Sequence, residues 1–381
     1  MEFRALDPYR AELEARGPLE PVRRALAALH VVVRADHGAD ESADAVDAID
    51  WEATMRLRRR ADGLGFGVAE AMDTAQRFRI GWPAARRLIE ECGRLGLAHG
   101  FVAGAGADQL AAVSGREELV AAVTEQARLI QAAGGEVMLL PLAWLARESV
   151  GEEGYVEVYG AIVSALDGPL YVHWLGEEFL PELKGYFPGD SFARVMALDP
   201  HKVRGAKLSL FDPAREVHLR RDLAARDQVL LTGDDLHFRD LIRGAGPIER
   251  HTTIGGRRVA LGDFSHALLG LFDAIAEPAA LALGFLAHGD AGRYEELMSP
   301  CEELGRWLFR APVMHYKAGL AFIAWLNGLQ QNPMLFAREE RGRDRAHLLR
   351  AAELAAAAGC LSDPILAARR LASPGIGREH L

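Results

Sequence analysis

The sequence predicts an α/β protein, a (β/α)8 TIM barrel with a helical C-terminal extension. Short apolar or β-branched runs recur eight times, and an amphipathic helical pattern follows each run. Successive runs begin roughly 25–37 residues apart, which is about the length of one βα unit. Strands that alternate with helices form a parallel sheet. Eight units at near-even spacing favour a closed barrel, although an open eight-stranded sheet fits the same pattern.

The expected strands are short and lie at regular intervals. They are residues 30–34, 64–68, 101–104, 136–140, 170–174, 203–208, 228–232 and 258–261. Between them, segments such as 83–97 and 117–133 carry apolar residues at i, i+3 and i+4 spacing, which is typical of helices that pack on a sheet.

The two ends of the chain have helical patterns without a strand signal. Residues 8–29 are expected to form a helix before the first strand, and residues 265–330 and 338–372 to form further helices. We therefore expect a barrel with an N-terminal helix over residues 1–264 and a helical extension packed on it over residues 265–381.

Composition excludes several classes of protein. The net charge of −10 is spread over 381 residues without a basic stripe, which argues against a nucleic-acid partner. The three cysteines are far apart and form no CxxC pair, so neither a zinc ribbon nor a disulfide framework is expected. No signal peptide and no apolar run of about 20 residues is found, so we expect a cytoplasmic protein that does not enter the membrane.

A lysine in the sixth expected strand is the strongest candidate for catalysis. Strand periodicity places Lys207 on one face with Gly205 and Ser209, and this small and polar face suits the barrel interior. A lysine buried there either pairs with a carboxylate or loses its proton as desolvation lowers its pKa. A neutral amine is what imine formation requires, whereas a structural ion pair is the alternative.

The fifth expected strand carries a histidine and a tyrosine on one face. Histidine titrates near neutrality, so His173 is a candidate proton shuttle, and a hydrogen-bonded core histidine is the alternative. Tyr171 would place a phenol one layer deeper in the barrel.

Acidic residues and histidines cluster at or just past the ends of expected strands, where a TIM barrel builds its active site. Asp73 is the strongest of these candidates, for substrate hydroxyls or for general acid–base catalysis. Asp36, His37 and Glu70 follow as substrate-binding candidates. Asp234 and Asp235 are expected to cap a loop rather than to act on a substrate.

Five segments resemble the dihydrodipicolinate synthase and N-acetylneuraminate lyase family, in the order of that family and over roughly residues 30–360. FVAGAGAD contains Gly104 and is similar to the third-strand motif. The other four segments are GYVEVYGAIVSALDGPLYVHW (154–174), VRGAKLSLFD (203–212), VLLTGDD (229–235) and APVMHYKAGLAFIAWLNGL (311–329).

The resemblance implies a class I aldolase-type barrel without a cofactor, in which the sixth-strand lysine forms a Schiff base with a 2-keto acid. By position this lysine is Lys207, and such barrels are usually dimers or tetramers. The chain departs from the family at two places. His173 occupies the position of a proton-shuttling tyrosine, and the segment that binds the substrate carboxylate retains Thr74 but has Asp73 beside it. The chain therefore resembles a divergent branch.

The leading hypothesis is a Schiff-base-forming lyase, aldolase or dehydratase that acts on a 2-keto acid or sugar-acid-like carbonyl substrate. Two alternatives stay open. One is a metal-dependent barrel isomerase or aldolase, whose ligands would be Glu70, Asp73, His173 and His266 without a recognisable ligand spacing. The other is a non-catalytic ligand-binding barrel, which requires Lys207 to be ion-paired and charged.

Overall fold

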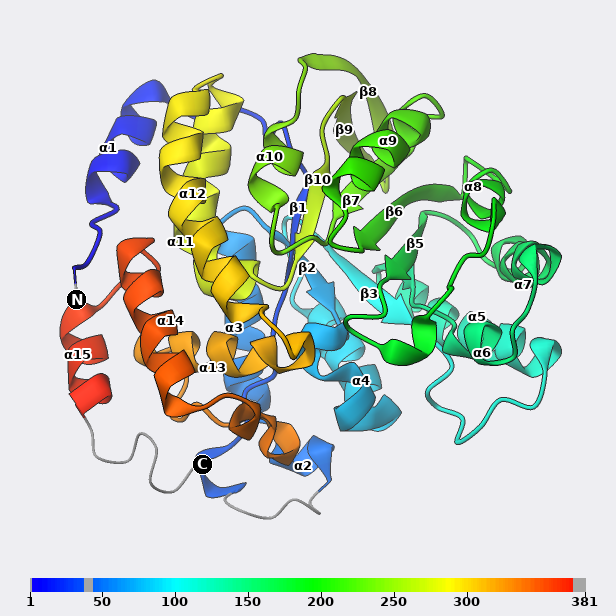
Figure 1. Ribbon diagram of the computed structural model, residues 1–381, viewed down its shortest axis with the longest axis horizontal. Helices are drawn as coiled ribbons and strands as arrows, with labels where there is room; N and C mark the ends of the chain where they lie inside the picture. Colours follow the sequence, from blue (N-terminus) through cyan, green and yellow to red (C-terminus); the bar gives the residue numbers. More distant parts are fainter. Residues whose placement is uncertain (1, 38–43, 373–381) are drawn as a thin grey trace.

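The computed structural model describes residues 2–37 and 44–372, and it confirms the predicted TIM barrel with C-terminal helices (Figure 1). Eight parallel strands close into a barrel in the order β1-β10-β7-β6-β5-β4-β3-β2. Their bounds are β1 Ala25–Ala28, β2 Gly67–Glu70, β3 Phe101–Ala105, β4 Glu136–Leu139, β5 Leu170–Leu175, β6 Val203–Ser209, β7 Val229–Thr232 and β10 His266–Leu269.

The expected first strand is wrong. The barrel begins with the alanine-rich segment Ala25–Ala28, which lies inside the range expected to be helical, and the N-terminal helix α1 ends at Arg16. The run of valines at 31–33 has already left the barrel, and Val33 forms an isolated antiparallel bridge with Ile49. Because a strand that is buried on both faces needs only small or apolar side chains, alanine suffices in β1 and β-branching was a misleading signal.

The expected eighth strand is also wrong. Residues 258–261 belong to β9 (Arg257–Gly262), which pairs with β8 (Ile248–Ile254) in a two-stranded antiparallel hairpin outside the barrel. The barrel strand is β10, so the barrel continues past the expected boundary at residue 264. Both segments are apolar and alternate with turns, and the sequence pattern alone does not show which one pairs with β1.

The helices surround the barrel and extend beyond it on one side. Figure 1 shows the helices from α11 onward gathered beside the barrel. The helices are α1 Asp7–Arg16, α2 Ala45–Ala48, α3 Trp51–Gly63, α4 Arg77–Arg94, α5 Arg116–Ala132, α6 Ala143–Arg147, α7 Glu152–Ala165, α8 Ser191–Met196, α9 Pro213–Ala224, α10 Phe238–Arg243, α11 Phe272–Ala287, α12 Ala291–Leu308, α13 Tyr316–Leu326, α14 Arg345–Ala357 and α15 Pro364–Ala372. Five short 3-10 turns lie among the described residues: η1 Ala35–His37, η2 Asp73–Ala75, η3 Pro181–Leu183, η4 Val313–His315 and η5 Phe336–Gly342.

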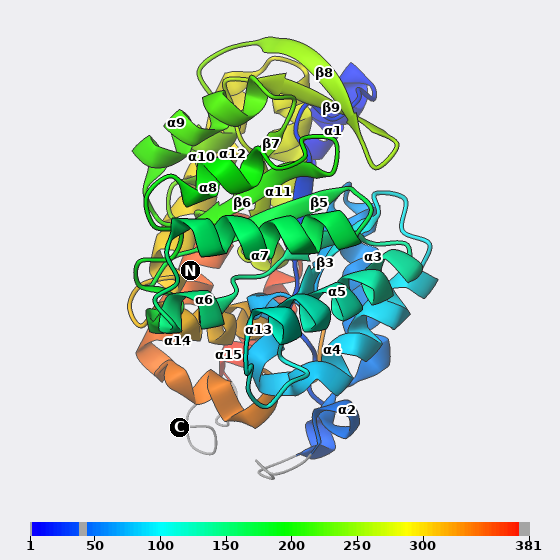
Figure 2. The same cartoon turned by 90° about the vertical axis from the view of Figure 1, so that its right-hand side faces the viewer.

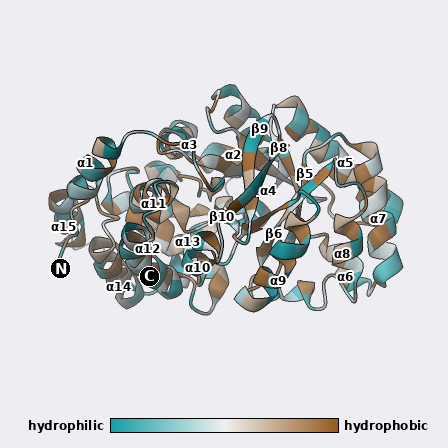
Figure 3. Cartoon of the chain, turned by 90° about the horizontal axis from the view of Figure 1, so that it is seen from above, coloured by the Kyte–Doolittle hydropathy of each residue, from teal (hydrophilic) through white to brown (hydrophobic). Residues whose placement is uncertain are grey.

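Helix α13 is central to the C-terminal extension. Every residue of α13 except Trp325 is buried, because α11, α12, α14 and α15 pack around it. The outer helices are amphipathic instead, and Figure 3 shows hydrophilic residues of α7 along the rim of the molecule. The extension therefore has its own apolar interior, which continues into the barrel wall.

A small apolar cluster fills the barrel and is closed at the N-terminal ends of the strands. Leu26, Val102 and Leu268 belong to this cluster, as do Ile254 and Val259 of the hairpin. The hairpin thus covers the bottom of the barrel and leaves the C-terminal ends of the strands for a site. Among the described residues, no helix is both long and apolar enough to cross a membrane.

Candidate active site

Lys207 lies in β6 with its side chain buried in the upper part of the barrel. It is in register with His173 of β5 and Leu231 of β7, and it is 9% exposed. Gly233, directly after β7, leaves room for it, since a Cβ atom at that position would lie 2.7 Å from Lys207 Cε and would also clash with Ser209 Oγ. Glycine at this strand end is therefore a packing requirement of the lysine side chain.

Burial changes the protonation of Lys207. Desolvation lowers its pKa to about 8, against the opposing charges of Asp235 and Asp73. No described residue forms an ion pair with its ammonium group, although Lys317, the other buried lysine nearby, is paired. The carboxyl group of Asp235 accepts a hydrogen bond from Leu271 N at 2.8 Å, and burial raises its pKa to about 7. A neutral amine and a carboxyl group that can exchange a proton thus coexist near neutral pH.

His173 lies beside Lys207 and is neutral at pH 7. Its Nε2 atom is 3.3 Å from Ser209 Oγ, whereas its buried Nδ1 atom has no hydrogen-bond partner among the described residues. Burial, and then the charge of Lys207, hold the pKa of His173 well below its ordinary value. The expectation that this histidine titrates near neutrality therefore does not hold, because the barrel interior disfavours the imidazolium form.

Asp73 and Thr74 form the 3-10 turn η2 after β2, and the first turn of α13 packs against them. Asp73 accepts a hydrogen bond from Tyr316 Oη at 3.0 Å and forms an ion pair with Lys317 Nζ at 3.1 Å. Thr74 Oγ1 lies 2.9 Å from Tyr316 Oη. The Asp73 side chain is 34% exposed and the Lys317 side chain 5%, so the carboxylate is the accessible member of the pair.

Sequence reasoning did not single out Tyr316 and Lys317 as site residues. Their signal was the segment 311–329, which resembles a family motif and contains both. Phe309 stacks on Tyr316 with ring centroids 4.2 Å apart and fixes the start of α13 over the η2 turn. Periodicity along a helix does not reveal that its first turn reaches a strand end some 240 residues earlier in the chain.

Two expected substrate-binding residues, Glu70 and Gly104, are held by other contacts. Glu70 forms an ion pair with Arg58, and both side chains are fully buried. The carbonyl oxygen of Gly104 accepts a hydrogen bond from Arg77, and a Cβ atom at this position would lie only 2.9 Å from the side chain of Leu140. Glu70 and Gly104 therefore take part in structural contacts beside the mouth of the barrel.

Tyr171 points toward the opposite end of the barrel. Its hydroxyl group is hydrogen-bonded to Glu136 at 2.7 Å and to Arg24, at the N-terminal ends of β4 and β1. Asp36 forms an ion pair with Arg34 in the exposed turn η1. The side chain of His37 lies outside the described part of the chain. The structure therefore brings together Lys207, His173, Ser209, Asp73 and Thr74, with Tyr316, Lys317 and Asp235 added.

The four candidate metal ligands do not converge. His266 accepts a hydrogen bond from Arg24 N and donates one to Ala260 O near the bottom of the barrel, and burial lowers its pKa to about 3. Glu70 is held by Arg58. The described residues contain no group of three or more histidine, cysteine or acidic side chains that could hold a metal ion. Asp234 caps the loop after β7 as expected, by accepting hydrogen bonds from Leu236 N and His237 N.

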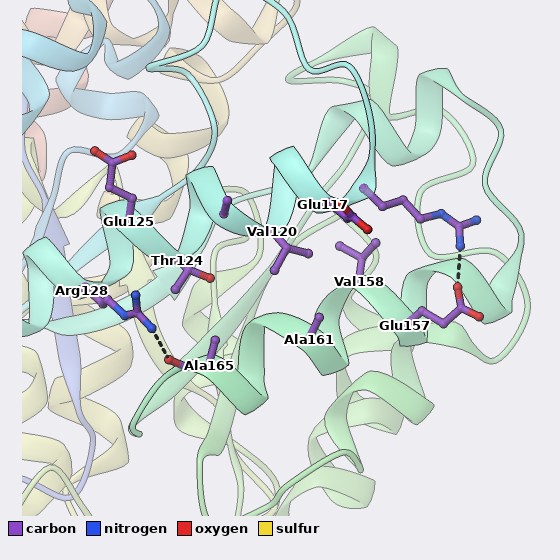
Figure 4. Close-up of a pocket in the computed structure, with 11 residues that line it drawn as sticks. Glu117, Val120, Thr124, Glu125, Arg128, Glu157, Val158, Ala161 and Ala165 are labelled. Carbon is purple, nitrogen blue, oxygen red and sulfur yellow. Dashed lines mark hydrogen bonds and ion pairs between the residues drawn. The ribbon is translucent and has the colours of Figure 1, made fainter.

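An apolar surface groove of about 640 Å³ lies between α5 and α7, on the outside of the barrel. Figure 2 shows these helices side by side, and Figure 4 shows Val120, Val158 and Ala161 facing one another between them. Arg116 is ion-paired with Glu157, and Arg128 donates a hydrogen bond to Ala165 O. None of its lining residues is a candidate for catalysis, so this groove is separate from the candidate active site.

Several solved structures share the fold of this chain. Dihydrodipicolinate synthase from Oceanobacillus iheyensis is similar with a TM-score of 0.62 and 13% identity, over 91% of this chain and 97% of its own. The corresponding enzyme from Aquifex aeolicus has a TM-score of 0.63 and 12% identity, over 90% and 100%. Sialic acid aldolase from Ruminococcus gnavus has a TM-score of 0.61 and 15% identity, over 89% and 98%.

These similarities confirm the resemblance to dihydrodipicolinate synthases and N-acetylneuraminate lyases, and at this identity they establish the fold. The chain belongs to the family described as "Protein of unknown function (DUF993)", whose model matches residues 5–374. No curated protein matches the sequence. A match to that family model, together with low identity to the solved enzymes, agrees with a divergent branch.

Proposed function

We propose that this protein is a Schiff-base-forming lyase, an aldolase or dehydratase that binds a 2-keto acid or sugar-acid-like carbonyl substrate through Lys207. One observation carries the proposal. Lys207 is buried at the mouth of the barrel without an ion-pair partner among the described residues, and its pKa of about 8 leaves a usable fraction of neutral amine at pH 7. A lysine kept charged by an ion pair would instead have favoured a non-catalytic barrel.

The chemistry follows from the neutral amine. Lys207 Nζ attacks the carbonyl carbon and a proton moves from nitrogen to the carbonyl oxygen, which gives a carbinolamine. A further proton, donated to the hydroxyl group, lets that group leave as water and leaves a protonated imine. The protonated imine withdraws electrons from the adjacent carbon. In an aldolase, the hydroxyl group on the next carbon loses its proton and the bond between these two carbons breaks, which releases a carbonyl product and leaves an enamine that is then protonated to the product imine. In a dehydratase, the adjacent carbon loses a proton and the hydroxyl group on the next carbon is protonated and leaves as water. Hydrolysis of the product imine then regenerates the amine.

Two neighbouring groups suit the proton transfers. Asp235 interacts electrostatically with Lys207 and has a pKa near 7, so it can protonate the departing hydroxyl group of the carbinolamine. His173 is neutral and hydrogen-bonded to Ser209, so it can accept a proton from substrate or relay one through the serine hydroxyl. The closed barrel limits access of water to these groups.

A catalytic lysine in a protein of the same fold supports the proposal. A second structure of the Ruminococcus gnavus aldolase, with 15% identity to this chain, is of a catalytic lysine mutant of that enzyme. That aldolase therefore depends on a lysine within the same fold, and Lys207 is our candidate for the same part in this chain.

Reductive trapping tests the proposal. Carbonyl compounds are incubated with the protein and borohydride, and the modified peptide is identified by mass spectrometry. We expect one adduct at Lys207 and none in Lys207→Ala. Lys202→Ala is the matched control, because this lysine donates to Val163 O away from the mouth and should leave trapping unchanged. Trapping that is absent from Lys207, or that persists in Lys207→Ala, would refute the proposal.

A further inference from the structure

The turn after β2 presents a carboxylate to the mouth of the barrel, and its counter-ion lies behind it. Asp73 is about one third exposed, whereas Lys317 is almost fully buried. A Cβ atom at Gly270 would lie 3.0 Å from Thr74 Oγ1, and the next residue, Leu271, donates its N–H to Asp235, so the η2 turn lies at the same end of the barrel as Asp235 and Lys207. The charge of Asp73 also acts on Lys207. A group bonded to the imine carbon on this side would therefore come close to Asp73 rather than to an unpaired cation.

The hydrogen bonds of Asp73 leave it able to accept more. Its Oδ1 atom accepts from Lys317 Nζ at 3.2 Å, and Oδ2 accepts from Lys317 Nζ at 3.1 Å and from Tyr316 Oη at 3.0 Å. A carboxylate has about four acceptor positions and no donor. The remaining acceptor capacity lies on the exposed side, where hydroxyl groups of a substrate can donate to it.

A substrate carboxylate finds no such partner there. The positive charge of Lys317 is compensated by its ion pair with Asp73. The hydroxyl group of Tyr316 is already hydrogen-bonded to Asp73 and Thr74. To bind at this turn, a carboxylate would have to displace Asp73 from Lys317 and then lie beside it, with two like charges in a partly buried site. This arrangement selects against an acid group directly next to the reacting carbonyl.

We infer that the substrate is a polyhydroxylated carbonyl compound in which a hydroxyl-bearing carbon, instead of a carboxylate, is bonded to the carbonyl carbon, and that the Asp73–Lys317 pair makes this selection. The inference rests on the proposed function and narrows it: simple 2-keto acids are excluded, whereas a sugar acid with a remote carboxylate is retained. Asp73 is thereby a specificity-determining residue that accepts the adjacent hydroxyl.

Pyruvate and hydroxyacetone form a matched pair of probes, because they differ only in the carboxylate or hydroxymethyl group beside the carbonyl. Each is trapped at Lys207 with borohydride, and each rate is divided by that of the same compound with a free alkylamine. We expect the normalised rate of hydroxyacetone to exceed that of pyruvate by about 10- to 100-fold, as expected for one like-charge contact at short range.

Substitution of the acid should reverse the selection. Asp73→Asn keeps the shape, removes the charge and frees Lys317, so pyruvate should gain and hydroxyacetone should lose, shifting their ratio by at least about tenfold. Asp73→Thr should shift it the same way and serves as a second variant if the amide folds poorly. Asp222→Asn, on the exposed side of α9, is the matched control and should leave the ratio unchanged.

The results of these trapping experiments distinguish a failure of the proposed Schiff-base function from a failure of the inferred selection by Asp73. An absence of adducts at Lys207 with both probes, and with larger hydroxylated carbonyl compounds, would refute the proposed function itself. Trapping of Lys207 by pyruvate as fast as by hydroxyacetone, after normalisation in the wild-type protein, would overturn the inference and leave the Schiff-base function standing. A ratio unaffected by either Asp73 variant would overturn it as well.

Discussion

At the scale of single residues, strand periodicity located the central side chains but not their electrostatics. Alternation placed Lys207 and Ser209 on the inner face, as the structure has them. It also placed Tyr171 and His173 on one face, yet could not show that Tyr171 reaches down to Glu136. A pKa depends on what surrounds the group in three dimensions, so the neutral state of His173 and the partners of Asp73 became visible only in the fold.

The first prediction concerns the pH dependence of imine formation. The pKa of Lys207 is lowered to about 8, so its neutral fraction should rise roughly tenfold per pH unit below 8 and level off above it. Trapping rates at Lys207 measured from pH 6 to 10 should show this midpoint, whereas the trapping rate of a free alkylamine should keep rising up to its pKa of about 10.4. Asp235→Asn should move the midpoint lower, because the carboxylate favours the ammonium form. A midpoint at 10 or above would contradict the assigned environment.

The second prediction concerns His173. His173→Gln keeps approximate size and one hydrogen bond to Ser209 but removes the basic nitrogen, so turnover should fall roughly 10²–10⁴-fold. Trapping at Lys207 should persist, although more slowly. Since burial lowers the pKa of His173, the pH profile of wild-type turnover should show no step near pH 6.5 that depends on His173. His201→Gln, in an exposed loop, is the control; turnover of His173→Gln at the wild-type level would make His173 a packing residue.

At the scale of elements, the strands that carry strong patterns were predicted and those with weak ones were not. The fifth and sixth expected strands agree with β5 and β6 within a residue at each end, because their inner and outer faces differ clearly. The first barrel strand consists of four alanine and leucine residues, and the valine-rich run at 30–34 was predicted to be the strand in its place because it has the stronger β pattern. The contact between α13 and the η2 turn had no signal in the helical periodicity, and only the resemblance of segment 311–329 to a family motif singled out this part of the chain.

The third prediction concerns the junction of α9 with β7. Glu216 is buried, where Ser265 and Thr232 donate to it, and burial raises its pKa to about 8. Its folded pKa lies above the unfolded value of about 4.5, so its contribution to stability is full below pH 4.5 and is lost as the pH rises through 8. Glu216→Gln should remove this loss and stabilise the protein relative to wild type at pH 9.

Thermal unfolding of both proteins at pH 6 and pH 9 measures this effect. The difference in Tm between Glu216→Gln and wild type should be larger at pH 9 than at pH 6, by several degrees if the change approaches 1–2 kcal/mol. Glu249→Gln, on the exposed strand β8, controls for removal of one negative charge. An equal difference at the two pH values would show that Glu216 is already ionised in the folded protein near neutrality.

At the scale of the whole molecule, the barrel and the C-terminal helices share one site. The barrel supplies Lys207 and Asp73, and α13 supplies Tyr316 and Lys317. The extension is also tied to the first βα loop, where His30 Nε2 lies 2.6 Å from Gln330 Oε1. Fold class could be predicted from the sequence because it depends on repeated periodicity, whereas this contact between distant segments could not.

The fourth prediction is a homo-oligomer, a dimer or tetramer. The resemblance implies it, and C-terminal helices rich in alanine and leucine would favour it, but α13 buries nearly all of its residues within the chain. The expectation therefore depends on surfaces other than α13. Light scattering coupled to size exclusion, at micromolar protein, should give a multiple of 41.5 kDa. A mass of one chain would contradict the prediction.

The last prediction is that the C-terminal helices are not a separable domain. A chain that ends at residue 310 lacks α13, so Thr74 loses the hydroxyl of Tyr316 and the buried His30 loses Gln330. Each buried polar group left without a partner costs about 1–3 kcal/mol, and the apolar residues that pack on α13 become exposed as well. These losses together approach the total stability of about 5–15 kcal/mol that a domain has. The truncated chain should therefore aggregate or unfold without a cooperative transition. The full chain under the same conditions is the control and should unfold in a cooperative transition. A cooperative transition of the 1–310 chain near the wild-type Tm, together with trapping at Lys207, would show that the barrel folds and forms its imine without the extension.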